Sequence, residues 1–452
     1  MSYVPNTTAE QQAMLHAVGV ETIEDLLQSV PEQVRLRRSL ALPPALPEPN
    51  LKRLMLGMSE KNADLDHYVS FLGAGSYDHT LPSVVPHLYK RAEFVTSYTP
   101  YQPEISQGML QAIYEFQTMV CQITGMDTAN ASLYDGSTAV VEAALLAVGS
   151  GDGGEVLVSH ALDPQYRATL ETYAWSRGFT VREIGLEEGI TSLAELEATL
   201  TNTTKAVIVQ HPNFLGNLED VRALGQLVHT TNALYVVAIT EPASLGILTA
   251  PGDYGADIVA GEGQSLGSPL GYGGPALGLF ATKSEYVRRM PGRLVGKTID
   301  DRGQEGYVLT LQTREQHIKR ERATSNICTN QALLALASTV YLTALGKEGF
   351  RELSEHCLRK AHYAGERIGL VPGFKLLFGQ RPYFDEFVVG TPMPVTQLNA
   401  ELRDRGIIGG YDLAHDYPEL GDAALFAITD VHTRADIDSL VVALEDIVGG
   451  VA

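Results

Sequence analysis

The stretch GADIVAGEGQSLGSPLGYGGPALGLFA (255–281) predicts a short buried strand, a glycine-rich connection without lysine, and a second apolar strand. Such a loop could hold phosphates, hold a cofactor, or be the remnant of a lost site. The dinucleotide-binding fingerprint requires G-x-G-x-x-G between the first strand of a sheet and a helix. Here Gly261, Gly263 and Gly267 are spaced one residue too widely, and the loop leads to another apolar strand late in the sheet. The spacing therefore argues against a dinucleotide site.

A second candidate is the stretch YDGSTAVVEAALL (134–146), which predicts a helix. Ser137 and Thr138 stand at its amino end, where free backbone N–H groups, hydroxyls and the helix dipole could bind an anion. The same residue types cap helices in proteins of every kind. On this motif alone, capping is the preferred interpretation.

The third candidate is SYTPYQPEISQG (97–108), a proline-braced stretch rich in hydroxyl groups. Side chains of this kind on a stiff loop suit contact with a small polar ligand or a partner chain. An equally supported alternative is a surface turn whose tyrosines cover the helix predicted from Ser106. The candidate residues are Tyr98, Thr99, Tyr101, Gln102 and Glu104.

His211 belongs to HPNFLGNLED (211–220), which follows a predicted strand. In a parallel sheet the carboxyl end of a strand is where ligands bind. The residue could equally be a loop histidine whose hydrogen bonds are all satisfied.

Charge and cysteine content restrict the class of protein. Thirty-three basic residues against 54 acidic ones give a net charge of −21, which disfavours binding to nucleic acid or to anionic membranes. Three cysteines (Cys121, Cys328 and Cys357) have no metal-binding spacing and indicate a reducing compartment. The amino terminus has no apolar signal core and no apolar run is long enough to span a bilayer, so we expect a cytoplasmic protein without a metal.

The elements that must position these residues follow a regular alternation. Apolar runs that predict strands alternate with stretches that predict helices, a pattern typical of an α/β fold with a large, mostly parallel sheet covered by helices on both faces. A helix is predicted from about Ser106 to Gly125. The strands are predicted at 155–160, 179–185, 205–212, 233–240, 257–260 and 276–281. The expected domains are an arm with a proline-rich strap (1–70), the large α/β domain (71–330) and a smaller C-terminal α+β domain (331–452).

The arm is expected to be helical and to cover a partner. Thr7 and Glu10 form a plausible capping box, and ETIEDLLQSV (21–30) has helical spacing up to Pro31. The stretch LALPPALPEPN (40–50) has four prolines and predicts a stiff, extended strap. Apolar residues such as Leu26 and Leu27 need burial, which favours an interface role for residues 1–50.

Three stretches in this order (96–146, 211–220 and 255–275) resemble the fold-type I pyridoxal-phosphate enzymes. Among these, the chain is similar to the glycine dehydrogenase (decarboxylating) family, the P-proteins of the glycine cleavage system, over nearly its whole length. In some organisms this enzyme is divided between two homologous subunits of about this length. The present sequence resembles the first of them, the alpha chain.

The resemblance implies two cofactor-binding residues that this sequence does not have at the expected positions. Pyridoxal phosphate needs a lysine after the strand at 257–260 and an acid on the strand at 233–240. Gln264 and Ser265 stand at the lysine position, and the strand at 233–240 contains no acid. Between residues 206 and 296 the single lysine is Lys283, just beyond the next strand.

The resemblance therefore implies that this chain carries no catalytic residue of its own. Ser137 and Thr138 would be the remnant of a phosphate site, and pyridoxal phosphate would be bound by a beta subunit. The substrate would be glycine, and the aminomethyl group would pass to the lipoyl arm of H-protein. The loop with Tyr98 and Tyr101 would reach the pocket of the partner.

Two other interpretations stay open on the sequence. The chain could be a free-standing pyridoxal-phosphate enzyme that uses Lys283 or a lysine outside the sheet. It could also be a non-catalytic scaffold or regulator of the beta subunit.

Overall fold

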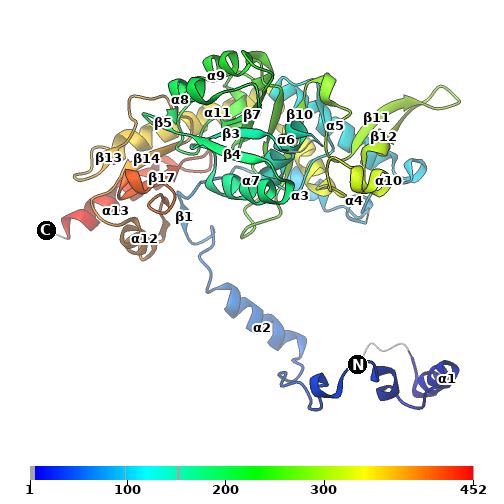
Figure 1. Cartoon of the computed structure of the whole chain (residues 1–452). Helices are drawn as coiled ribbons and strands as arrows, with labels where there is room; N and C mark the ends of the chain where they lie inside the picture. The colour runs from blue at the N-terminus through cyan, green and yellow to red at the C-terminus, as the bar shows by residue number, and fades with distance from the viewer. Residues whose placement is uncertain (1–5, 97, 150–152, 451–452) are drawn as a thin grey trace. The chain divides into compact units, whose positions relative to one another are not determined.

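The computed structural model describes residues 6–96, 98–149 and 153–450 (Figure 1). The chain forms two compact units, Met1–Ala63 and Asp64–Ala452. Each is described by itself, and the division of the second unit at residue 330 stays a prediction.

The first unit contains two α-helices, α1 (Thr8–Val18) and α2 (Glu48–Ser59). The capping box of Thr7 and Glu10 is confirmed at the start of α1. The helix predicted over 21–30 is wrong, since only a short 3-10 helix, Glu24–Leu27, forms there. Pro31 disfavours helical geometry at the residue before it, so the stretch is too short for a stable helix.

The strap lacks regular secondary structure over most of its predicted length. Residues 40–47 form neither helix nor strand, but the last three residues of the predicted strap, 48–50, belong to α2. Pro49 lies in the first turn of α2, where a helix tolerates proline because the missing N–H would have had no partner.

A seven-stranded sheet dominates the second unit. Its spatial order is β2-β10-β9-β8-β7-β3-β4; β4, β3, β7, β8 and β9 run parallel, and β10 runs antiparallel to both β9 and β2. All six predicted strands are confirmed. They are β3 Glu155–Ser159, β4 Thr180–Ile184, β7 Thr204–Gln210, β8 Leu234–Ile239, β9 Ile258–Glu262 and β10 Gly278–Thr282, and the seventh strand, β2 Thr128–Ala129, was not predicted.

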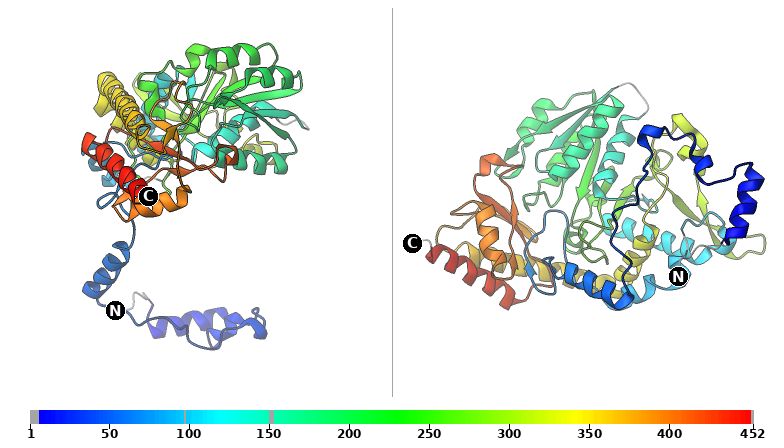
Figure 2. Two further views of the ribbon diagram at one scale, coloured as in Figure 1. Left: turned by 90° about the vertical axis from the view of Figure 1, so that its left-hand side faces the viewer. Right: turned by 90° about the horizontal axis from the view of Figure 1, so that it is seen from below.

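Helices cover both faces of this sheet, as Figure 2 shows. Residues that alternate along the strands pack in two separate clusters, one with α6 (Gly136–Val148) and α7 (Pro164–Arg177). The other contains residues of α5 (Gln107–Thr124), α9 (Val221–Val228) and α11 (Ala332–Ile368), the last of which is interrupted at Gly346. The predicted fold class is thus confirmed.

The carboxyl-terminal part adds a small antiparallel sheet. Its order is β13-β14-β17-β16, and β1 pairs in parallel with β15 beside it. Its residues form an apolar cluster of their own with residues of α11 and of the two helices α12 and α13. The elements are β1 Val69–Ser70, β13 Lys375–Leu376, β14 Glu386–Gly390, α12 Val395–Arg403, β15 Ile407–Ile408, β16 Tyr411–Asp412, β17 Ala423–Ala427 and α13 Arg434–Gly449.

Several short elements complete the second unit. The hairpin of β11 (Leu294–Ile299) and β12 (Glu305–Thr310) packs against α5 and was not predicted. Within the described residues, no helix has both the length and the apolar character needed to cross a bilayer. The remaining short elements are α3 Val84–Tyr89, α4 Ala92–Val95, β5 Leu186–Glu187, β6 Ile190–Thr191, α8 Leu193–Thr199 and α10 Gln316–Lys319.

Candidate functional site

The carboxyl ends of β8 and β9 meet at one edge of the large sheet, beside the amino end of α6. In parallel α/β sheets ligands bind at this edge. Glu241 follows β8, and Gln264 and Ser265 follow β9. All three side chains are buried.

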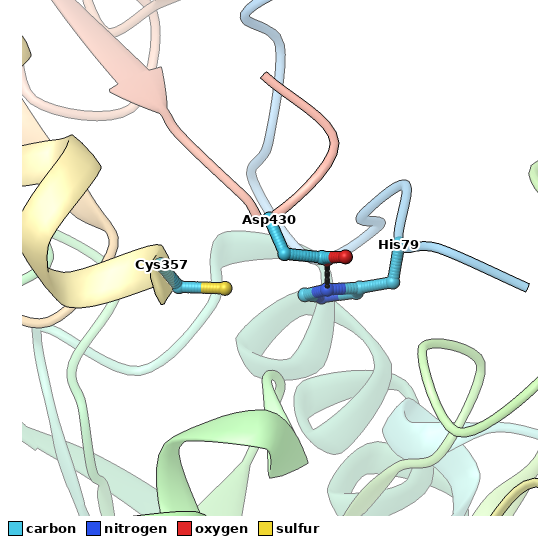
Figure 3. Close-up of side chains that lie close together, drawn as sticks. All are labelled: His79, Cys357 and Asp430. Atoms are coloured by element: carbon cyan, nitrogen blue, oxygen red, sulfur yellow. Dashed lines mark hydrogen bonds and ion pairs between the residues drawn. The ribbon is translucent and has the colours of Figure 1, made fainter. Parts of the chain in front are cut away.

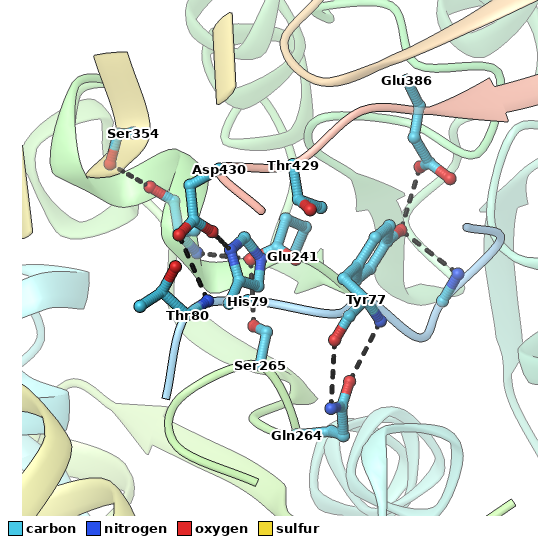
Figure 4. Close-up of polar contacts among 12 residues, drawn as sticks. Tyr77, His79, Thr80, Glu241, Gln264, Ser265, Ser354, Glu386, Thr429 and Asp430 are labelled. Atoms are coloured by element: carbon cyan, nitrogen blue, oxygen red, sulfur yellow. Dashed lines mark hydrogen bonds and ion pairs between the residues drawn. The ribbon is translucent and has the colours of Figure 1, made fainter. Parts of the chain in front are cut away.

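Ser265 is tied to a carboxylate rather than left free. Its hydroxyl donates to Glu241 Oε1 at 2.9 Å, and the same oxygen accepts from the Ala243 backbone N–H at 2.7 Å. Figure 4 shows Glu241 between Ser265 and His79, whose Nε2 lies 3.1 Å from Glu241 Oε2. The acid next to the lysine position is therefore already engaged by three groups.

His79 joins Glu241 to the small sheet. Its Nδ1 lies 2.6 Å from Asp430 Oδ1, just after β17. Burial acts to lower the pKa of His79, but the attraction of Glu241 and the bond to Asp430 outweigh it and raise the pKa well above its ordinary value. An imidazolium therefore bridges two carboxylates.

Cys357 lies beside this bridge (Figure 3). One ligand-type atom each of Cys357, His79 and Asp430 lies within 4.8 Å of the others, as in a metal site. Both ring nitrogens of His79, however, face carboxylates, and burial raises the pKa of the Cys357 thiol to about 11. These contacts form an ion-pair network with a protonated thiol next to it.

Gln264 holds a segment of chain across the sheet edge. Its Oε1 accepts from the Tyr77 backbone N–H at 3.0 Å, and its Nε2 donates to the Tyr77 carbonyl at 3.1 Å. The Tyr77 hydroxyl in turn donates to Glu386 Oε2 at 2.9 Å (Figure 4). Gln264 thus fixes the backbone of Tyr77 through two hydrogen bonds.

Carboxylates occupy the amino end of α6. Asp135 accepts from the Thr138 backbone N–H at 2.7 Å and from the Ser137 hydroxyl at 2.8 Å. Glu262 accepts from the backbone N–H groups of Gly136, Gly263, Gln264 and Leu277, at 2.7 to 3.1 Å. Burial outweighs these bonds and raises the pKa of Glu262 to about 7.

The proline-braced loop is anchored to Arg293. The side chains of Tyr98 and Tyr101 are 81% and 57% exposed, and Gln102 and Glu104 are exposed as well. Thr99 is half-buried and accepts from Arg293 Nη1 at 3.4 Å. Hydrogen bonds thus lead from this loop to Arg293, whereas those of Gln264 and Ser265 lead to Tyr77 and Glu241.

Lys283 faces the opposite edge of the sheet. It follows β10, which runs antiparallel to β9, and its Nζ lies 2.5 Å from Asp257 Oδ1, before β9 begins. His211 is buried and its Nδ1 accepts from the Glu219 backbone N–H at 3.2 Å, while burial lowers its pKa to about 4. His211 is thus a satisfied, neutral loop histidine.

Comparison with known proteins identifies the family. The family model for the glycine cleavage system P-protein matches residues 1–444. The chain belongs to this family. "Probable glycine dehydrogenase (decarboxylating) subunit 1" of Geobacillus kaustophilus is 51% identical over 98% of each chain, and that of Moorella thermoacetica 50% identical over 99% of this chain and all of the other.

Solved structures agree with this assignment. A crystal structure of glycine decarboxylase (P-protein) in inhibitor-bound form is 42% identical, with a TM-score of 0.89 over 99% of this chain and all of the other. A sphingosine-1-phosphate lyase of Burkholderia pseudomallei shares the fold at 14% identity, with a TM-score of 0.65 over 91% of this chain and 93% of the other. The fold-type I architecture is thereby confirmed.

Pyridoxal phosphate, the cofactor of this fold type, does not fit the residues at the sheet edge. Ser265 cannot form an imine, and Glu241 is already paired with His79. Glu262 and Asp135 already accept hydrogen bonds from backbone N–H groups that a phosphate would need, so the anion site at the amino end of α6 is occupied by the protein's own side chains. Among the described residues, this sheet edge therefore offers no amine for an imine, no unengaged acid and no free anion site.

Sequence reasoning missed several of these residues. Glu241 directly follows the predicted strand at 233–240, so a search one residue further would have found it. His79 and Asp430 are 351 positions apart and meet only through the fold. Arg293 stands in an unremarkable turn before the hairpin, and no motif pointed to it.

Proposed function

We propose that this chain is the subunit of glycine dehydrogenase (decarboxylating) that carries no cofactor. It acts with a homologous beta subunit, which binds pyridoxal phosphate through a lysine. Together they decarboxylate glycine and transfer the aminomethyl group to the lipoyl arm of H-protein. The similarity to the curated subunits over 98% of the chain supports this assignment.

The proposal that the beta subunit and not this chain binds the cofactor rests on two residues, Ser265 and Glu262. The former replaces the reactive amine by a hydroxyl bound to Glu241, and the latter fills the anion site at α6 with a carboxylate. A chain with this edge depends on another chain for its chemistry.

The role proposed for the loop is to complete the pocket of the beta subunit. Pro100 and Pro103 restrict the backbone on either side of Tyr101, and the loop leads directly into α5, whose packed face anchors it. Its exposed hydroxyl and amide groups can orient a small zwitterion such as glycine without adding a cation.

Expression of this chain alone and together with the beta subunit tests the assignment. The purified chain, supplied with pyridoxal phosphate, should form no borohydride-reducible adduct and show no glycine decarboxylation, because it has no amine at the site. The complex should show both. A reducible adduct on any lysine of the isolated chain, Lys283 included, would favour a free-standing enzyme instead.

Variants of the loop distinguish a subunit that contributes to catalysis from a scaffold that does not. Tyr101→Phe in the assembled enzyme should lower glycine turnover while cofactor content and subunit affinity stay normal. Wild-type turnover and Michaelis constant for Tyr98→Phe, Tyr101→Phe and Gln102→Ala would support the scaffold.

A further inference from the structure

Arg293 is a buried cation whose positive charge has no carboxylate of the described residues in close contact. Its side chain is only 4% exposed, and the nearest carboxylate oxygen, Glu315 Oε2, lies 4.0 Å from its Nε. Among the residues that the structure describes, that Nε has no hydrogen-bond partner. Because a buried charge with only one long ion pair is costly, such an arrangement calls for a role beyond packing.

The contacts of Arg293 converge on the loop. Its Nη2 donates to the Tyr101 hydroxyl at 2.9 Å, and the guanidinium lies over the Tyr101 ring, 5.2 Å from the centroid. Its Nη1 donates to the Thr99 hydroxyl at 3.4 Å and to Asn330 Oδ1 at 3.5 Å. The arginine therefore fixes both the plane of the ring and the position of its hydroxyl.

The direction of this hydrogen bond determines what Tyr101 can offer. A guanidinium is only a donor, so the Tyr101 oxygen must be the acceptor, and its own proton points elsewhere. A charge-assisted bond to the oxygen also polarises the O–H group and makes it a stronger donor. More than half of the Tyr101 side chain is exposed, so this donor is available to another molecule.

We infer that Arg293 is a positioning residue that presents the Tyr101 hydroxyl as an outward donor to a carboxylate oxygen, that of the glycine substrate. The inference rests on the proposed function, since the pocket is completed by the partner subunit. Arg293 itself touches neither substrate nor cofactor; it acts through Tyr101.

A double-mutant cycle in the assembled enzyme tests this role. Arg293→Lys keeps the charge but loses the flat, forked guanidinium. It should lower kcat/KM about tenfold, the loss expected when a charge-assisted hydrogen bond no longer positions a donor. In the Tyr101→Phe background the same change should have no further effect. Arg293→Gln, which retains an N–H donor, should be more active than Arg293→Met.

Arg167→Lys is the matched control, because Arg167 also lies over a tyrosine, Tyr417, 5.8 Å from the centroid. It should leave turnover unchanged. Equal losses from Arg293→Lys with and without the Tyr101 hydroxyl would overturn the inference, as would failure of every Arg293 variant to assemble, since both indicate a purely structural residue. A silent Tyr101→Phe would instead refute the proposed role of the loop, and the inference with it.

Discussion

The side chains around Ser265 affect cofactor binding at the sheet edge as much as Ser265 itself does. Its hydroxyl lies 2.9 Å from Glu241 Oε1, and Glu262 accepts hydrogen bonds from the backbone N–H groups nearby. A lysine placed at this position would meet a carboxylate first. An ammonium paired in this way keeps its proton and is a poor nucleophile.

Ser265→Lys is therefore expected not to restore cofactor chemistry. The isolated variant, incubated with pyridoxal phosphate and borohydride, should show no adduct at position 265 by peptide mass spectrometry. Adding Glu262→Ala, which frees four backbone N–H groups, should increase the affinity for the cofactor, measured by equilibrium dialysis. Glu155→Ala, at the other end of the sheet, is the control and should change nothing. An adduct in the single variant would contradict the prediction.

The polar residues of this edge were only partly accessible from the sequence. Gln264 and Ser265 could be located, because a strand and a glycine-rich loop frame them on either side. Their hydrogen-bond network could not be predicted, because Tyr77 and Glu386 belong to distant segments that come together only in the complete fold. Local sequence predicts where a strand ends but not which remote side chain lies against it.

At the scale of elements, α2 carries an exposed apolar stripe. Leu51, Leu54, Met55 and Met58 follow the spacing of one helix face, and about half of each side chain is exposed. An arm of this composition needs a surface to cover it. The predicted interface role of residues 1–50 extends by this pattern to α2.

Leu54→Asp should weaken association with the beta subunit. Loss of one buried leucine removes about 1.5–3 kcal/mol, so the dissociation constant should rise roughly ten- to a hundredfold. Sedimentation of the purified pair measures this, and circular dichroism should show an unchanged fold. Lys52→Ser, a polar change elsewhere on α2, is the matched control. Equal dissociation constants for both variants would place the interface outside α2.

Elements with strong periodicity were predictable, and irregular ones were not. The buried strands and α5 have apolar patterns that leave little choice of structure. The hairpin of β11 and β12 has half-buried or exposed residues on most positions, so no periodic apolar signal marks it. The helix predicted over 21–30 failed because its spacing alone could not outweigh the nearby proline.

At the scale of the whole molecule, several buried carboxyl groups share one electrostatic property. Burial raises the pKa of Glu142, Glu219 and Glu262 to about 7 and that of Asp163 to about 6. In the unfolded chain these groups would lose their protons near pH 4 to 4.5. The folded protein therefore holds protons that the unfolded chain has released.

The sign of the resulting pH dependence follows from this difference. Stability associated with a raised pKa is present below the unfolded value and is lost as the pH rises through the folded one. The pKa of His211, lowered to about 4 by burial, and that of His432, also lowered by burial, act in the opposite direction but are outnumbered by the buried carboxyl groups. Growing negative charge on a chain already at −21 adds self-repulsion at high pH.

The free energy of unfolding should thus decrease between about pH 5 and pH 7, by about 1.4 kcal/mol per pH unit for each net proton involved. Thermal unfolding followed by circular dichroism over this range should show a falling Tm. Glu142→Gln should make the fall shallower, because Glu142 is buried and its Oε1 has no hydrogen-bond partner to lose among the described residues. Glu171→Gln, an exposed position on α7, should leave the slope as it is. A Tm that stays level or rises over this range would show that the buried carboxyl groups keep ordinary pKa values.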